Sequence, residues 1–361
     1  MGTFSTRIST RTSSLTRTDR AFAGRRKTLL VSGVAAAAAA GVAAAVIPAF
    51  ASSGSGSGTS SGSGGQHGAH AAHGGRSVEV QSGAATGRGG ALFAAGMNGA
   101  NEVPVQGGPA VGDKDGRALE FVKVKGDKVS VTVKWRGTAK PTALHIHQGA
   151  KGANGGIKVD FTKLLAKSKH HRVTGTVKVD DAALLEQLKT DPNSFYANLH
   201  TAEFPGGAVR GQLHKVTTDF DFRNAAANFQ ASVIQGSQIY ECKKAEDGSG
   251  TFAFSQRDVR AGLGGDIAHD FVAPNSGTPR WTAPDRSQVT GKLISKTPNG
   301  DKNIPELDLA ATQTGKHRGL LADTAEILRL NTVGGVAPAG TCEAGAIAEV
   351  PYQADYVFVQ R

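Results

Sequence analysis

The chain has 361 residues, of which 39% are hydrophobic and 20% charged, and its formal net charge is +11. This length is enough for two domains of ordinary size. Seven basic side chains and one acid lie within residues 1–27, which leaves only +5 for the rest of the chain. The remaining lysines are scattered and form no basic stripe interleaved with aromatic residues, so we expect no nucleic-acid partner.

Residues 1–51 have the three-part pattern of an export signal. An uncharged run rich in Ala and Val extends from Thr28 to Ile47, and Pro48 and a small-x-small sequence at 49–51 follow it. About 20 apolar residues could instead cross a bilayer, but a run dominated by Ala inserts weakly and no basic cluster follows it. We therefore expect a cleavable signal peptide over 1–51, no membrane span after cleavage, and a mature chain that is secreted or at the cell-envelope surface.

Residues 52–91 consist largely of Gly, Ser and Ala, with a small histidine cluster at His67, His70 and His73. Such a composition buries too little apolar surface to offset the loss of chain entropy on folding. We expect a disordered linker here. Histidines at a spacing of three could hold a metal ion loosely, but we expect them to be ordinary polar linker residues.

Residues 92–215 carry the alternation that is typical of half-buried strands. The clearest example is 128–135, in which three valines and Trp135 share one face. Further strands are expected over 173–179, 195–200 and 208–213. A single short helix is expected over 181–189, with Asp180 or Asp181 as its N-cap. Many short strands, Gly-rich turns and one brief helix predict a β-sandwich or a barrel-like domain.

Residues 216–234 have no clear period and are expected to connect two domains. The second block, 235–361, again has short strands separated by Gly and Pro clusters. Its expected strands are a hairpin formed by 239–243 and 251–254 about Asp247-Gly248, followed by 289–294, 326–330 and 352–359. The fold class expected for the chain is therefore mainly β, with two small sandwich or barrel-like domains after the signal and the linker.

Cys242 and Cys342 are the two cysteines of the chain. In an exported protein, an even pair is most simply one disulfide. A metal pair or reactive thiols would need partners at short spacing, which neither cysteine has. We expect a Cys242–Cys342 disulfide.

Three histidines in the first domain could carry chemistry. His145 and His147 point to the same face of a strand, because the side-chain period of a strand is two residues, and His200 occurs in a second strand. Neutral imidazoles of this kind bind copper or zinc. The same three side chains could instead hydrogen-bond loop carbonyls and hold the Gly-rich turns in place. Both interpretations remain open from the sequence.

Four stretches around these histidines resemble the CHRD domain, first named in chordin. They are 97–104 (MNGANEVP), 144–149 (LHIHQG), 198–203 (NLHTAE) and 204–213 (FPGGAVRGQL). The resemblance covers about residues 92–214. It implies a β-rich extracellular module that is not an enzyme, and microbial members are similar to secreted or cell-envelope proteins.

The His-x-His strand is also similar to one in Cu/Zn superoxide dismutases. That pattern requires further histidines and an aspartate in a long loop. The candidates here, His170 and His171, lie in a segment with Lys167 and Lys169, which would repel a cation. The intradomain disulfide of the dismutases is absent as well.

The second domain resembles a family of secreted proteins of unknown function, which implies no activity. The matching stretches are 238–242, 268–271, Trp281, 329–335 and 350–356. His269 and Asp270 could line a pocket beside Trp281, although a lone histidine near aromatics is more often a structural group. The sequence contains no nucleophile elbow, Walker loop, dinucleotide fingerprint or zinc-protease helix in the right context.

Together these features predict an exported binding or cell-envelope-associated protein without catalytic turnover. Its expected partner is an extracellular or cell-wall component, either a protein or a polymer. The alternative is a metal-binding redox protein of the superoxide dismutase type, with copper or zinc as its cofactor on the three histidines.

Overall fold

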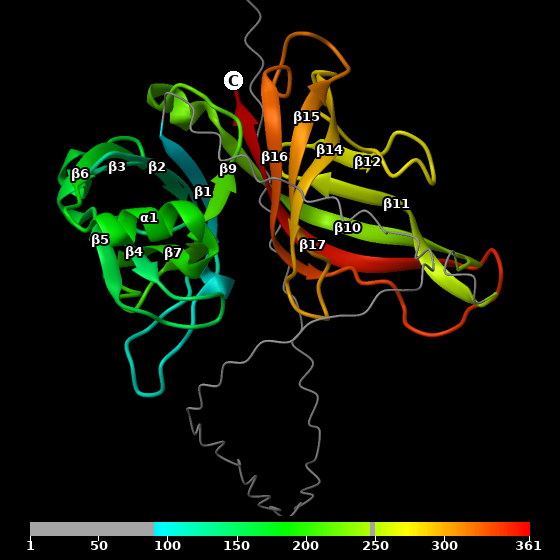
Figure 1. Ribbon diagram of the computed structural model, residues 1–361, viewed down its shortest axis with the longest axis horizontal. Coiled ribbons are helices and arrows are strands. Elements are labelled where there is room, and N and C mark those ends of the chain that lie inside the picture. The colour runs from blue at the N-terminus through cyan, green and yellow to red at the C-terminus, as the bar shows by residue number, and fades with distance from the viewer. Residues whose placement is uncertain (1–89, 246–249) are drawn as a thin grey trace, which may run out of the picture. The chain divides into compact units, whose positions relative to one another are not determined.

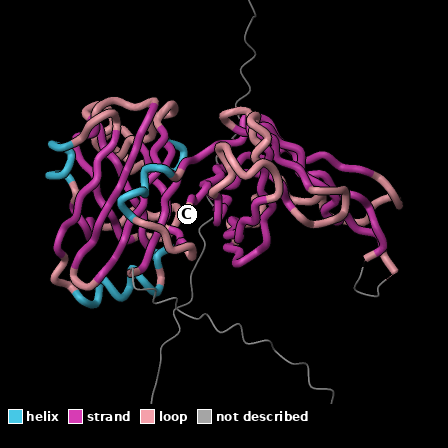
Figure 2. Tube along the Cα trace, turned by 90° about the horizontal axis from the view of Figure 1, so that it is seen from above, coloured by secondary structure: helices cyan, strands magenta, loops and turns pink. Residues whose placement is uncertain are grey.

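We analysed a computed structural model of the chain, and the structure describes residues 90–245 and 250–361. The expected signal peptide, residues 52–89 of the expected linker with its three histidines, and the turn at 247–248 lie outside the described residues. Ala91, the last residue of the expected linker, is the first residue of a strand. The described residues belong to one compact unit, in which strands predominate (Figures 1 and 2). The prediction of a mainly β chain is confirmed.

The first part of the chain folds into one nine-stranded sheet (Figure 1). In chain order its strands are β1 (Ala91–Asn98), β2 (Arg117–Lys125), β3 (Lys128–Arg136), β4 (Pro141–Gln148), β5 (Ile157–Asp160), β6 (Arg172–Lys178), β7 (Phe195–Thr201), β8 (Val209–Gln212) and β9 (His214–Val216). Eight of them lie in the order β5-β4-β7-β8-β1-β2-β3-β6, and β9 pairs with β1. The alternation at 128–135 is the buried pattern of β3, whose valines face the core as predicted.

The helices of the described residues are short. They are η1 (Gly99–Asn101), η2 (Thr162–Lys167), α1 (Ala182–Thr190), η3 (Pro192–Ser194) and η4 (Phe222–Ala227). The predicted helix is α1, and its N-cap is Asp181, whose side chain accepts a hydrogen bond from the Leu184 amide at 2.9 Å. No helix within 90–245 or 250–361 is long and apolar enough to cross a membrane.

The core of this sheet determines which way the functional side chains face. Leu144 and Ile146 of β4 and Leu199 of β7 are fully buried in it. Burial of each such side chain stabilises the fold by about 2 kcal/mol. Because successive strand residues point to opposite faces, the histidines of β4 and β7 are directed away from this core.

The second part of the chain folds into a closed eight-stranded barrel, which confirms the barrel-like prediction. Its strands are β10 (Phe229–Lys244), β11 (Phe252–Leu263), β12 (Ile267–Phe271), β13 (Pro279–Thr282), β14 (Gln288–Thr297), β15 (Glu306–Gln313), β16 (Thr324–Gly334) and β17 (Ile347–Gln360). β10 begins at Phe229, inside the stretch expected to be a connector, because the Phe229 ring stacks on Phe358 of β17 with centroids 4.8 Å apart.

The predicted disulfide is present. Cys242 of β10 is bonded to Cys342 in the segment before β17, and their Cα atoms are 5.9 Å apart. The bond ties the first strand of the barrel to the loop that leads into the last one, in agreement with the sequence analysis.

An apolar cluster joins the sheet, the connector and the barrel. Its members come from β1, β2, the segment after β8, β16 and β17, and are Leu92, Ala94, Leu119, Phe121, Val216, Phe220, Ala225, Leu328, Leu330, Val357 and Val359. Phe220 of the connector meets Phe121 edge to face, with ring centroids 5.5 Å apart. The connector lacks a strand period because its apolar residues fill this junction.

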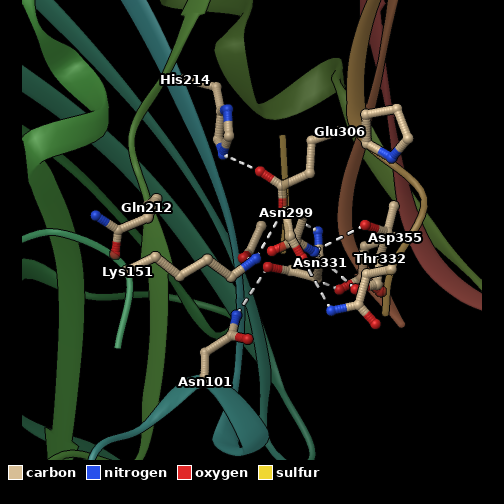
Figure 3. A network of polar contacts seen from close by, with 12 residues as sticks. Asn101, Lys151, Gln212, His214, Asn299, Glu306, Asn331, Thr332 and Asp355 are labelled. Carbon is tan, nitrogen blue, oxygen red and sulfur yellow. Dashed lines mark hydrogen bonds and ion pairs between the residues drawn. The ribbon is translucent and has the colours of Figure 1, made fainter. Parts of the chain in front are cut away.

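Glu306 is the centre of a polar network beside this cluster (Figure 3). Its buried carboxylate accepts hydrogen bonds from Lys151 Nζ and from the Asn331 amide, each at 2.9 Å. His214 Nε2 lies 3.4 Å from the other carboxylate oxygen. The network therefore connects the loop after β4 and strand β9 with strands β15 and β16.

Asn331 continues the network through its side chain. Its Nδ2 donates to Asp355 Oδ2 at 2.7 Å and to the Gly96 carbonyl at 2.9 Å, and its Oδ1 accepts from Asn101 Nδ2 at 2.8 Å. Asn331 has a positive φ of 52°, a conformation that Asn tolerates better than most residues.

Candidate metal centre

The structure brings the three predicted histidines together. His145 and His147 lie on β4, and His200 lies on the neighbouring strand β7, where it is opposite Ala143. One ligand atom of each histidine lies within 4.8 Å of the other two. Within the described part of the chain, this is the only group of three or more His, Cys, Asp or Glu residues that could hold a metal ion.

His147 and His200 each use one ring nitrogen to hold a loop. The Nδ1 atom of His147 is 3.0 Å from the Gly155 carbonyl, and Nδ1 of His200 is 3.0 Å from the Pro205 carbonyl. A carbonyl oxygen can only accept, so Nδ1 carries the proton in both rings and Nε2 keeps a free lone pair. The loop-holding role considered for these residues is therefore compatible with ligation through the other nitrogen.

His145 is oriented by different partners. Its Nε2 lies 3.2 Å from Thr162 Oγ1 and 3.5 Å from Asp160 Oδ1, and Asp160 is directly opposite His145 in the β4–β5 pair. The carboxylate favours a proton on Nε2, so the lone pair is on Nδ1. That atom lies 3.3 Å from Nε2 of His200.

Burial keeps the three imidazoles neutral. It is the largest cause of a lowered pKa in His145, His147 and His200. The pKa of His145 falls to about 4, because the positive charges that His200 and His147 would carry add to the effect of burial and outweigh the opposing effect of Asp160. Neutral histidine is the form that binds a metal.

An aromatic stack fixes the His147 ring. His147 lies parallel to Tyr196 with ring centroids 4.9 Å apart, and the Arg210 guanidinium lies 3.4 Å from the Tyr196 centroid. Tyr196 is thus contacted from β4 and β8, the two strands that flank β7. The buried Nε2 of His147 has no hydrogen-bond partner among the described residues.

A small pocket opens beside the histidines. His147 and His200 border a cavity of about 200 Å³, together with Val103, Asn154 and Gly206. A ligand bound by the two imidazoles would therefore face a space large enough for water or a small molecule.

A buried carboxyl group lies next to this pocket. Both oxygens of Glu102 are 3.1 Å from Asn198 Nδ2, and Asn198 is opposite His145 on β7. Burial raises the pKa of Glu102 to about 7. A Cβ at Gly207, which has φ of 137°, would lie 2.6 Å from this carboxylate, so the Gly-Gly turn is required for the close approach.

Sequence reasoning missed the partners of the histidines. Asp160 and Thr162, the partners of His145, belong to no recognisable motif, and Glu102, the buried carboxyl group next to Asn198, belongs only to the 97–104 family motif. The only signal for Asp160 was its position on a short strand after a Gly-rich turn. Its pairing with His145 depends on strand register, which the sequence does not specify.

His170 and His171 are not members of the cluster. They form a turn before β6 with positive φ values of 50° and 54°, and His171 lies near Trp135 with ring centroids 6.2 Å apart. The structure therefore does not bring the additional histidines of the dismutase pattern to the centre.

The second predicted group, His269, Asp270 and Trp281, does not line one pocket together. His269 stacks on Trp281 inside the barrel with centroids 4.4 Å apart, and both line a cavity. Burial lowers the pKa of His269 to about 4, and its Nδ1 is 2.9 Å from the Arg280 carbonyl. Asp270 does not line this cavity, because successive strand residues alternate in direction, and it pairs with the Arg280 side chain instead.

The fold and the histidine group define a mainly β, disulfide-bonded protein with a candidate three-histidine centre. Comparison with protein families shows that residues 93–213 match the CHRD domain. Residues 261–360 match a protein family of unknown function, DUF3455. The chain therefore contains a CHRD domain followed by a DUF3455 domain, and both resemblances seen in the sequence are confirmed. No curated protein and no solved structure gives a significant match.

Proposed function

We propose that this chain is an exported binding protein whose CHRD domain holds one transition-metal ion, zinc or copper, on His145, His147 and His200. One observation carries the proposal. Each ring has an acceptor for the N–H of one nitrogen, and one ligand nitrogen of each ring lies within 4.8 Å of those of the other two rings. Histidine ligands in metal sites characteristically donate their second N–H in this way.

The spacing of the nitrogens fits a metal. Two nitrogens bound at 2.0–2.1 Å to a tetrahedral zinc are about 3.3 Å apart, and Nδ1 of His145 and Nε2 of His200 are separated by 3.3 Å. The ligand nitrogen of His147 would need to move toward the other two by about 1.5 Å or less to reach the same spacing. The buried, unpartnered Nε2 of His147 supports this role.

Three imidazoles leave a fourth coordination position for water or a small ligand. The 200 Å³ cavity beside His147 and His200 supports an accessible position. Imidazole donors suit both zinc and copper. Redox turnover of the dismutase type is not part of this proposal, because His170 and His171 lie elsewhere.

The proposed location rests on the N-terminus, the disulfide and the CHRD domain. We propose that residues 1–51 are a signal peptide and that 52–91 are a linker to the CHRD domain. A disulfide and a CHRD domain are features of an extracellular protein. Fractionation of expressing cells should place the processed chain outside the membrane. Retention on cell-wall material would support envelope association, and processed chain inside the cell would count against export.

Metal binding is tested on the mature chain, residues 52–361, after chelator treatment. Calorimetric titration with zinc or copper should show one tight site per chain. The His147→Ala variant should bind more than ~100-fold more weakly, and His145→Gln serves as a second variant if His147→Ala does not fold.

Two controls separate this site from other histidines. A variant with His67, His70 and His73 changed to Ala should keep the tight site, as should His317→Ala, since His317 is exposed in a loop of the barrel domain. Tight binding that persists in a folded His147→Ala chain, or that disappears with the linker histidines, would refute the proposal.

A further inference from the structure

The barrel contains a cavity of about 670 Å³ that the metal proposal does not use. This volume lies within the range of small-molecule sites, roughly 300–1,000 Å³. Trp281, Tyr356 and His269 are buried side chains that line it, and Leu307 and Leu309 of β15 add an apolar wall. The cavity therefore has room for an organic molecule, and its wall combines aromatic and aliphatic side chains with polar ones.

Among the described residues, the charged side chains that line this cavity have one sign. Arg329 of β16 and Lys292 of β14 line it, and no Asp or Glu within 90–245 or 250–361 does. The acidic residues of β15 alternate with Leu307 and Leu309, and Glu306 is bound to Lys151 in the polar network. In the part of the barrel that the structure describes, the cavity wall thus presents cationic side chains without acidic ones.

Arg329 has no carboxylate partner among the residues that the structure describes. Its Nη2 donates to the Pro305 carbonyl at 2.8 Å, and its Nε is buried without a partner. Burial raises the pKa of the Tyr356 phenol, and the nearby Arg329 guanidinium opposes this rise. A partly buried guanidinium with a free N–H is a site for an anion.

Two further buried donors border the same space. Trp281 Nε1 and Gln238 Nε2 have no acceptor among the described residues, and both side chains are at least nine-tenths buried. Buried polar groups almost always have a hydrogen-bond partner. Together with Nε of Arg329 they are three unpartnered donors on residues that line the cavity.

We propose that the barrel binds an organic anion, with an acidic oxygen group held at Arg329 and an apolar, ring-containing body packed against Trp281 and His269. The oxygens supply acceptors for the free donors. The parallel stack of His269 on Trp281 gives a flat surface on which a ring can lie.

The proposal is tested with a pair of probes on the mature chain. The fluorescent probe is 8-anilinonaphthalene-1-sulfonate, and its emission should rise on binding, with energy transfer from tryptophan in a Trp135→Phe background, where Trp281 is the remaining tryptophan. Naphthalene-2-carboxylate should displace the probe at a concentration at least ~10-fold lower than its neutral carboxamide, because a charge-assisted hydrogen bond to Arg329 is lost in the amide.

Variants locate the anion in the cavity. Arg329→Gln should raise the half-displacement concentration of the carboxylate ~10-fold or more and leave that of the amide nearly unchanged, and Arg329→Lys should recover part of the difference. Lys316→Gln is a matched control, because Lys316 is an exposed cation that does not line the cavity.

Three outcomes of these displacement experiments would overturn the proposal. Equal displacement by the carboxylate and the amide in the wild-type chain would overturn the proposal, and this comparison holds even if Arg329→Gln does not fold. Probe binding without energy transfer from Trp281, or an effect of Lys316→Gln equal to that of Arg329→Gln, would overturn it too.

Discussion

Glu120 gives the sharpest prediction about stability. It lies on β2 between Ala118 and Val122, which both face the core of the CHRD sheet, and its side chain is fully buried. Neither carboxyl oxygen has a hydrogen-bond partner among the described residues. Burial raises the pKa of Glu120 from 4.5 to about 8, so the folded protein holds a proton that the unfolded chain releases.

The sign of the pH dependence follows from this difference. Below pH 4.5, the pKa of Glu120 in the unfolded chain, the side chain is neutral in both states and the fold keeps its full stability. As the pH rises from 4.5 toward the folded pKa of about 8, the free energy of unfolding falls, because the unfolded chain releases the proton and the folded protein retains it. Within this range, each pH unit lowers the free energy of unfolding by about 1.4 kcal/mol. Glu120→Gln removes this titration, so its free energy of unfolding relative to wild type should rise by about 3 kcal/mol between pH 4.5 and 7.

The assay is urea denaturation at several pH values, followed by Trp135 fluorescence in a Trp281→Phe background. Asp308, whose pKa burial and the charge of Glu326 raise to about 8, titrates in both proteins and cancels in the difference. Glu186→Gln, an exposed change in the same domain, is the control and should show no trend. If the difference in free energy of unfolding between Glu120→Gln and wild type stays constant from pH 4.5 to 8, the buried Glu120 carboxyl does not titrate as described.

Three further predictions concern the barrel, the network and the metal centre. Cys342→Ser opens the disulfide and should lower the free energy of unfolding of the barrel by about 4 kcal/mol, and a denaturation curve that does not respond to this change or to reductant would contradict it. Asn331→Asp places a carboxylate where Nδ2 now lies, 2.7 Å from Asp355 Oδ2, and should cost about 2 kcal/mol in thermal denaturation, whereas an unchanged melting temperature would argue against a stabilising network. Thr162→Val removes a partner of His145 Nε2 and should weaken zinc binding ~10-fold in calorimetry, whereas unchanged affinity would remove Thr162 from the centre.

Much of the fold could be predicted from local patterns. The valine alternation of 128–135 and the N-cap of the helix at Asp181 depend on neighbouring residues in the sequence, and the structure confirms both. The Cys242–Cys342 bond followed from the expected compartment and the count of cysteines. These inferences need no knowledge of which strands become neighbours.

The rest depends on contacts between distant residues. His145 and His200 could be placed on the same kind of strand, but their 3.3 Å approach requires β4 and β7 to pair in one register. The contact of Asp160 with His145 requires a second pairing, with β5. The cavity beside Trp281 requires all eight strands to close into a barrel.

The most direct test of the metal centre is X-ray absorption spectroscopy of the mature chain loaded with one equivalent of zinc. The chain should carry the triple substitution of the linker histidines, so that any bound ion belongs to the folded domains. We expect three imidazole nitrogens at about 2.0 Å and at least one oxygen ligand. A first shell with no imidazole, or an identical spectrum from the His147→Ala chain, would contradict it.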